Sequence, residues 1–356
     1  MPEPDDALKL PEGMIARREG DAQSLIRREA EAWLVEQCRD TLHSSGQWPL
    51  ETGSLEEYEE SCASHRARWS RAVGEWSFDA PFDVQVEPFF DSETAVGHWI
   101  RIDLADGLQG RAVYALPKHG TRPLPMVIAQ HGLGSSPERV FGPNDGEGLY
   151  HGFAAALLEA GYAVLAPANV TGNHPRARLT RLCHLPGRTL WGLEIGKLRR
   201  LIDYVSGQPE IDADRIGMWG LSLGGYYTAF AAALELRIKV GVGAAFFNDR
   251  FRKMAVSSPL YTAYIDVDEE HFWIPGHFSG GFGDAELVSL ICPRPLQIQQ
   301  GRADGIGWWP HQEAEFRRAA APYKGLGIPD RIEYAGHDGG HEVLVGRGLQ
   351  FLETFL

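Results

Sequence analysis

A serine flanked by glycines stands where a buried strand is expected to meet a helix. The motif is Gly220-Leu221-Ser222-Leu223-Gly224; an apolar run at 215–219 precedes it and an alanine-rich stretch at 226–234 follows it. A sharp turn of this kind lifts the serine Oγ out of the sheet and directs backbone N–H groups toward an anion. We therefore expect Ser222 to be a nucleophile and the amide of Leu223 to bind an oxyanion. Glycine and serine are frequent in this chain, so the motif needs support from its context.

A second glycine turn follows an earlier expected strand. His131-Gly132-Leu133 comes directly after the apolar run 126–130. We expect the backbone N–H of Leu133 to be the other oxyanion donor. His131 precedes the turn rather than facing the serine, so we interpret it as structural. The glycine pattern matches neither of the common nucleotide-phosphate motifs.

An acid and a base are expected on loops that follow late strands. Asp304 lies after the apolar run 296–300, and Asp249, after the preceding strand, is the alternative acid. For the base we favour His341, because Gly339-Gly340 gives a flexible approach to it; His337 is the alternative. Serine is a weak nucleophile until a base takes its proton, and a carboxylate orients that base. Ser222, His341 and Asp304 would therefore act as a catalytic triad.

Other chemistries find less support in the residue pattern. A zinc site at His337 and His341 is not favoured, since no third ligand accompanies them at a suggestive spacing. The four cysteines contain no C-x-x-C pair, so neither a zinc ribbon nor a thioredoxin-type site is indicated. We predict no metal and no cofactor.

The elements that must position these residues alternate along the chain. Expected strands and helices follow one another from about residue 82, after an antiparallel edge at 83–116, which predicts an α/β fold with a mostly parallel sheet and helices on both faces. Residues 1–75 are expected to form a helical extension, with helices at 22–42 and 54–73, and 76–356 the main domain. An aromatic-rich insertion at about 248–290 is expected to form a lid. Trp273 within it and Trp308 beyond Asp304 are candidate substrate-binding residues, or they fill a small core of their own.

Composition bounds the partners and the location. The chain has 356 residues and a formal net charge of −14, which argues against nucleic acid and anionic membrane surfaces. The N-terminus lacks a basic region followed by an apolar stretch, and no apolar run reaches the length of a membrane span. We expect a cytoplasmic protein that acts on a small-molecule substrate. The helical extension would pack on the main domain, cover the site or form a homodimer interface, and the sequence leaves these open.

Taken together, these stretches resemble the α/β-hydrolase superfamily, and within it the acetyl xylan esterase-like and dienelactone hydrolase-like branch, over about residues 82–356. The order Ser222, Asp304, His341 is that of the superfamily. Further stretches that carry the resemblance are Gly187-Arg188-Thr189-Leu190, residues 212–217, Ile274-Pro275-Gly276, residues 292–296 and Gly339-Gly340-His341-Glu342.

The resemblance implies a carboxylic ester hydrolase, a serine esterase, and it favours His341 over His337. True dienelactone hydrolases use a cysteine nucleophile, and Ser222 stands at that position here. The rival within enzymes is hydrolysis of a carbon–carbon bond beside a ketone by the same triad. A peptidase is less favoured because no β-propeller precedes the domain, and a non-catalytic binding protein is less favoured because all three triad residues are present.

Overall fold

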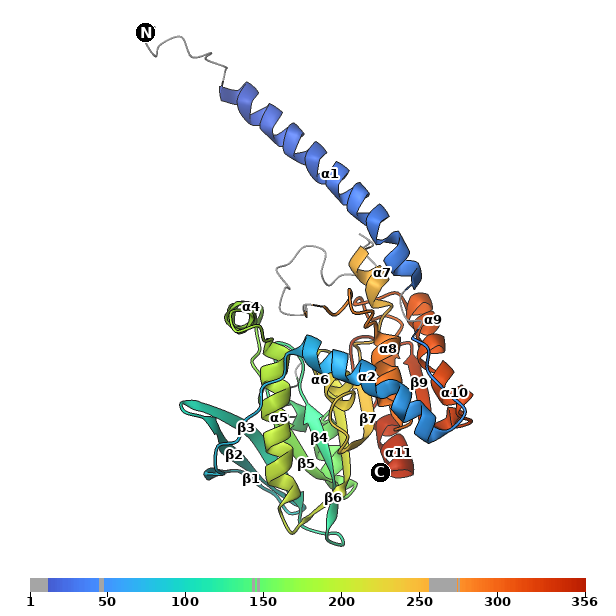
Figure 1. The fold of residues 1–356 in the computed structure, drawn as a ribbon. Coiled ribbons are helices and arrows are strands. Elements are labelled where there is room, and N and C mark those ends of the chain that lie inside the picture. Colours follow the sequence, from blue (N-terminus) through green and yellow to red (C-terminus); the bar gives the residue numbers. More distant parts are fainter. Residues whose placement is uncertain (1–11, 45–47, 143–144, 146–147, 256–273, 275) are drawn as a thin grey trace. The chain divides into compact units, whose positions relative to one another are not determined.

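A computed structural model describes residues 12–44, 48–142, 145, 148–255, 274 and 276–356. The chain divides into two compact units, Met1–Ser45 and Gly46–Leu356. The smaller unit contains helix α1, Glu12–Ser44, and the larger contains helix α2, Leu55–Val73, together with the sheet (Figure 1). The division expected near residue 75 therefore falls inside the larger unit.

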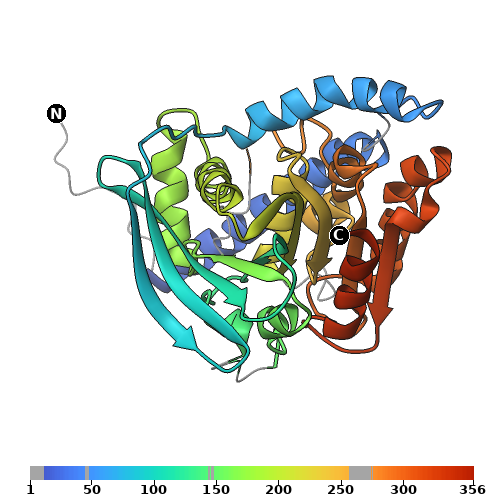
Figure 2. The ribbon, with the colours of Figure 1, turned by 90° about the horizontal axis from the view of Figure 1, so that it is seen from below.

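A nine-stranded sheet organises the larger unit, in the order β1-β2-β3-β5-β4-β6-β7-β8-β9. The strands are β1 Val84–Asp91, β2 Ala95–Ala105, β3 Leu108–Pro117, β4 Leu124–Gln130, β5 Ala163–Pro167, β6 Ile211–Leu221, β7 Ile238–Ala244, β8 Leu296–Gly301 and β9 Ile332–His337. The first three strands are antiparallel, and β3 pairs antiparallel with β5. From β5 to β9 every pairing is parallel. Figure 2 shows the antiparallel strands (cyan) at one side of this sheet and the red C-terminal elements at the other.

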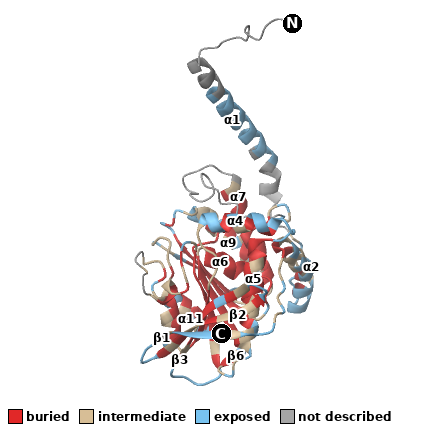
Figure 3. Cartoon of the chain, turned by 90° about the vertical axis from the view of Figure 1, so that its left-hand side faces the viewer, coloured by how far each residue is buried: buried red, intermediate tan, exposed pale blue. Residues whose placement is uncertain are grey.

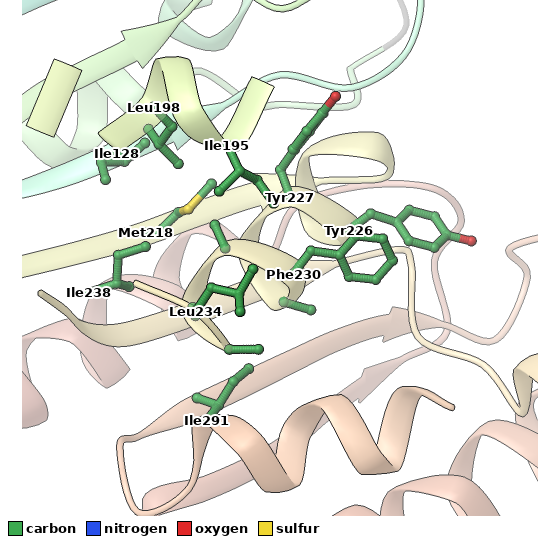
Figure 4. Close-up of a cluster of buried hydrophobic side chains, with 14 of the residues drawn as sticks. Ile128, Ile195, Leu198, Met218, Tyr226, Tyr227, Phe230, Leu234, Ile238 and Ile291 are labelled. Carbon is green, nitrogen blue, oxygen red and sulfur yellow. The ribbon is translucent and has the colours of Figure 1, made fainter. Parts of the chain in front are cut away.

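Side chains alternate between two apolar layers along the central strands. Ile128 and Met218 belong to a core cluster that includes residues of α2, α5, α6 and α8, whereas Val127 and Trp219 belong to a second cluster with α3 and α11. Because successive residues of a strand point to opposite faces, two separate clusters mean that both faces of the sheet are covered. Figure 3 shows this buried interior in red, and Figure 4 shows side chains of the first cluster. The predicted fold class is confirmed.

The helices of the larger unit follow the strands in sequence. They are α3 Phe153–Glu159, α4 Asn173–His184, α5 Leu190–Ser206, α6 Leu223–Ala232, α7 Arg250–Ala255, α8 Asp284–Ile291, α9 Trp309–Ala319, α10 Ala321–Gly325 and α11 Val345–Phe355, with short 3₁₀ turns at Arg139–Phe141 and Pro329–Arg331. Helices α4 and α9 are not anticipated by the sequence analysis. Neither helix begins with a side-chain N-cap hydrogen bond, so one usual signal of a helix start is missing. The proline in the first turn of α9 is the start signal that its sequence does offer.

Helix α2 is part of the core of the larger unit rather than an appendage to it. Its N-cap Ser54 accepts a hydrogen bond from the N–H of Glu57, and Gly74 ends it with φ of 62°. Tyr58 and Trp69 are fully buried, and the Tyr58 hydroxyl donates to the carbonyl of Ser289 in α8 at 2.7 Å. The end of α2 lies so close to α5 that a Cβ on Gly192 would meet the carbonyl oxygen of Gly74.

Helix α1 has an apolar stripe of four large side chains, which the smaller unit does not bury. Leu25, Ile26, Trp33 and Leu34 are each at least 50% exposed. The stripe therefore lies on the surface of the smaller unit, whereas the second helix of the expected extension, α2, packs on the main domain.

The predicted lid contains a core helix. In the part of 248–290 that the structure describes, α7 opens the segment and α8 is buried along its whole length. Arg250 of α7 donates from Nε to Oδ1 of Asp284 in α8 at 3.0 Å, and both side chains are buried. The last residues of the insertion are thus part of the packed domain. Residues 256–273 lie outside the described residues, and the lid expected there stays a prediction.

Candidate active site

Ser222 occupies a strained turn between β6 and α6. Strand β6 ends at Leu221 and helix α6 begins at Leu223, so Ser222 is the single residue between them. Its φ of 59° and ψ of −117° are unusual for a residue with a Cβ. The backbone N–H of Ser222 donates to the carbonyl of Ala244 at 2.8 Å, which fixes the turn to β7. Backbone strain of this kind persists where the surrounding structure holds it, often at functional sites.

The flanking glycines explain why the turn can be so tight. A Cβ on Gly220 would meet the carbonyl of Gly224, and a Cβ on Gly224 would meet the carbonyl of Gln130 at the end of β4. Helix α6 therefore approaches the sheet more closely than it could if either position carried a residue other than glycine. The result is a half-buried serine at the end of a buried strand.

Asp304 and His341 form a contact between the loops after β8 and β9. Oδ2 of Asp304 lies 2.9 Å from Nδ1 of His341. The carboxylate is held from two further sides, because Oδ1 accepts from the N–H of Ile306 at 3.1 Å and Oδ2 from Nε2 of Gln300 at 3.3 Å. Asp304 is 4% exposed and the His341 side chain is 28% exposed. An ionised Asp304 requires the proton on Nδ1, which leaves Nε2 of His341 as a base.

The predicted residues lie along one edge of the sheet. Ser222 follows β6, Asp304 follows β8 and His341 follows β9, and these strands run parallel. Carboxyl ends of parallel strands meet at the same edge, which is where α/β folds usually bind ligands. The β8 and β9 loops are tied together, since the N–H of Ala303 donates to the carbonyl of Gly339 at 3.0 Å. Within the described residues, no hydrogen bond joins Ser222 to His341, as is common in structures without substrate.

The loop after β4 lies against the serine turn. A Cβ added to Gly132 would be 3.3 Å from the Cβ of Ser222. Leu133 follows in this loop, and Leu223 is the first residue of α6, where a helix leaves its amide without an intrahelical partner. The N–H of Gly132 donates to the Tyr150 hydroxyl at 2.8 Å. The sequence did not predict a role for Tyr150, because nothing in the residues around it indicates a contact with a loop 18 residues earlier.

The ring of His131 contacts backbone groups of this loop and of the chain after β5. Its Nε2 accepts from the N–H of Asn169 at 3.2 Å, and its Nδ1 lies 3.0 Å from the carbonyl of Gly132. Burial lowers the pKa of His131 to about 4, so the imidazole is neutral and matches one acceptor and one donor contact. This arrangement agrees with the structural role expected for His131.

The alternative acid and base have other partners. Asp249 pairs with Nε of Arg252 at 3.0 Å and accepts from the backbone of the same residue. Nδ1 of His337 accepts from the N–H of Gly339 at 3.2 Å, within its own loop. Burial lowers the pKa of His337. The structure thus brings together Asp304 and His341, not Asp249 and His337.

Of the two tryptophans expected in the substrate pocket, Trp308 lies within the described residues. Trp308 immediately precedes α9, is 37% exposed and contacts the His311 ring edge-on, with centroids 4.4 Å apart. Trp273 lies outside the described residues. Both assignments to a substrate pocket remain predictions.

The described part of the chain has neither a candidate metal site nor a helix that could span a membrane. There, no three His, Cys, Asp or Glu side chains gather in a way that could hold a metal ion. None of its helices is long and apolar enough to cross a membrane.

Comparison with known proteins gives a curated relative and solved structures of the same fold. No protein-family model matches the chain. It is 26% identical over 312 residues to YtaP of Bacillus subtilis, a protein named as a hydrolase, and the match covers 83% of this chain and 99% of YtaP. A glucuronoyl esterase from Solibacter usitatus aligns with a TM-score of 0.63 at 15% identity, covering 87% of this chain and 98% of that one. Acetyl Xylan Esterase 1 from Thermoanaerobacterium aligns with a TM-score of 0.54 at 20% identity, over 88% and 97% of the two chains. The chain has the α/β-hydrolase fold.

Proposed function

We propose that this protein is a serine esterase that hydrolyses carboxylic esters through an acyl-enzyme. The observation that carries the proposal is the contact of Asp304 with His341 at the edge where Ser222 stands in its strained turn. The similarity to esterases of known structure and to YtaP supports the same class of reaction.

In the proposed mechanism each residue has a defined role. Nε2 of His341 takes the proton of Ser222 as Oγ attacks the ester carbonyl, and the backbone N–H groups of Leu133 and Leu223 stabilise the oxyanion. His341 then gives the proton to the leaving alcohol. Water, activated by the same nitrogen, attacks the acyl-enzyme and releases the acid. Asp304 holds the imidazole tautomer and stabilises the imidazolium in both halves.

The proposal is tested by hydrolysis of p-nitrophenyl esters of increasing acyl length. We expect turnover of short esters by the wild type and a loss of about 10⁴-fold or more in Ser222→Ala. Ser206→Ala is the matched control, because it removes a hydroxyl at the end of α5 that bonds to no protein group among the described residues. A wild type that a fluorophosphonate labels at Ser222 but that cleaves no ester would contradict the ester assignment and favour carbon–carbon bond hydrolysis.

A further inference from the structure

A short segment before α3 lies between the two loops of the proposed site. Asp145 organises it by accepting from three successive backbone N–H groups, those of Leu149 at 3.1 Å, Tyr150 at 2.9 Å and His151 at 2.9 Å. His151 has φ of 50°, a conformation that a residue with a Cβ rarely adopts. Three amides fixed to one carboxylate hold residues 149–151 in a single arrangement. We call these three residues the bracket.

On one side the bracket contacts the loop after β4. The Tyr150 hydroxyl accepts from the N–H of Gly132 at 2.8 Å, and Tyr150 is 2% exposed. The amide of Gly132 directly precedes the peptide unit of Leu133, whose N–H is the proposed oxyanion donor. Only the φ and ψ of Gly132 separate this peptide unit from the next, planar one, which joins the Gly132 carbonyl to the Leu133 N–H. That carbonyl lies 3.0 Å from Nδ1 of His131. With contacts at both ends of Gly132, the directions in which the Leu133 amide can point are limited.

On the other side the bracket contacts the loop that carries His341. Nε2 of His151 lies 2.8 Å from Oε2 of Glu342, and Oε1 of Glu342 accepts from the N–H of Gly340 at 3.2 Å. The carbonyl of Leu149 accepts from the N–H of Val343 at 2.9 Å. Contacts from the bracket and Glu342 thus hold the backbone on both sides of His341.

We propose that Tyr150 and Glu342 are positioning residues that align the oxyanion loop and the His341 loop with each other through this bracket. The inference rests on the proposed function for its catalytic meaning. Neither side chain is assigned a contact with substrate; each acts through a backbone group next to a residue that does the chemistry. Displacement of such groups by about 1 Å costs about 10²-fold in rate.

The test of the oxyanion side compares Tyr150→Phe with Tyr162→Phe. Both tyrosines belong to the same apolar cluster, but Tyr162 stands at the amino end of β5, away from the proposed site. We expect kcat for a p-nitrophenyl ester to fall about tenfold to 100-fold in Tyr150→Phe, with KM within about twofold, and to stay unchanged in Tyr162→Phe. A boronic acid that forms a tetrahedral anion on Ser222 should lose affinity by the same factor as kcat/KM.

The test of the histidine side uses Glu342, whose side chain is 30% exposed. Glu342→Ala removes both contacts, whereas Glu342→Gln keeps an oxygen for the N–H of Gly340. We expect a fall in kcat of about tenfold in Glu342→Ala and recovery of most of it in Glu342→Gln. Because Glu342 is partly exposed, we expect its variants to fold, so they still test the proposal if Tyr150→Phe does not fold.

Two readouts separate failure of this inference from failure of the proposed function. Amide hydrogen exchange should become faster at 131–134 in Tyr150→Phe and at 339–343 in Glu342→Ala, whatever the substrate is. If the wild type cleaves no ester, the rate of fluorophosphonate labelling at Ser222 replaces kcat. If both variants show wild-type reaction rates and wild-type amide exchange, the positioning role of Tyr150 and Glu342 is refuted. The esterase proposal is unaffected by that outcome.

Discussion

The carboxylate of Asp304 and the imidazole of His341 meet at 2.9 Å although 37 residues separate them in sequence. Each follows a strand, and β8 and β9 are adjacent and parallel, so their two loops leave the sheet side by side. The pair is oriented by the fold rather than by local sequence. Its geometry defines which nitrogen of His341 is free to act as a base, and the first two predictions depend on it.

Asp304→Asn should lower kcat for ester hydrolysis by about 10⁴-fold, because the amide favours the wrong imidazole tautomer while leaving the shape of the site in place. Asp249→Asn is the matched control, since Asp249 pairs with Arg252 instead. We expect it to retain activity within about threefold. Steady-state kinetics on both variants makes the comparison, and equal losses would contradict the choice of acid.

His341→Ala and His337→Ala distinguish the two histidines of one loop. The first removes the proposed base and should reduce kcat by about 10⁵-fold or more. The second removes an acceptor for the N–H of Gly339 and should cost less than about tenfold. Ester hydrolysis by the purified variants, with thermal unfolding as a check on folding, decides between them. A larger loss in His337→Ala would reverse the assignment.

Trp308→Ala should raise KM for an ester with an aromatic acyl group about fivefold, with little change in kcat, if the indole forms part of the acyl pocket. Phe82→Ala is the control, because that exposed ring belongs to the same unit and contacts Tyr204 of α5 rather than the loops of the proposed site. Kinetics with p-nitrophenyl benzoate and p-nitrophenyl acetate should show the effect only for the benzoate. An unchanged KM would remove Trp308 from the pocket.

Gly192→Ala should destabilise the larger unit by about 2 kcal/mol or more, because the new Cβ would overlap the carbonyl of Gly74 where α2 ends against α5. Gly346→Ala provides the contrast. Gly346 lies in the first turn of α11 with nothing within 4 Å of a new Cβ, so alanine there should be neutral or stabilise by up to about 1 kcal/mol. Urea unfolding of both variants measures the difference. Similar stabilities would contradict the close approach of α2 to α5.

His277 should make the stability of the protein depend on pH. Burial, with a smaller effect of Arg250, lowers the pKa of His277 from about 6.5 to about 3. The unfolded chain therefore binds one more proton than the folded chain between these values, and the free energy of unfolding falls as the pH drops from about 6.5 toward 3. Neither ring nitrogen has a partner among the described residues, and the ring stacks on Phe278.

His277→Phe should keep the stacking and remove this titration. The loss of unfolding free energy between pH 7 and pH 4 should be about 3 kcal/mol smaller in the variant than in the wild type. Urea unfolding at both pH values measures it. An equal loss in the two proteins would show that His277 is not buried in its neutral form.

Local sequence was sufficient for much of the fold and for the turn that holds Ser222. The alternation of apolar strands and helices, the two glycine turns and Ser222 depend on contacts between neighbours in sequence, where side-chain period and glycine spacing act directly. The strands expected from 83 to 335 all lie in the sheet, with ends that differ by a few residues.

Other features depended on which distant segments pack together. Sequence left Asp304 and Asp249 open, because only the pairing of β8 with β9 decides which carboxylate reaches a histidine. It did not anticipate α8 as a core helix, since the burial of that helix comes from α2 and α9. Tyr150 likewise meets Gly132 only after α3 and β4 are assembled. Short-range patterns thus determined the elements and the serine, whereas the register and packing of strands far apart in sequence decided which polar groups came within hydrogen-bonding distance.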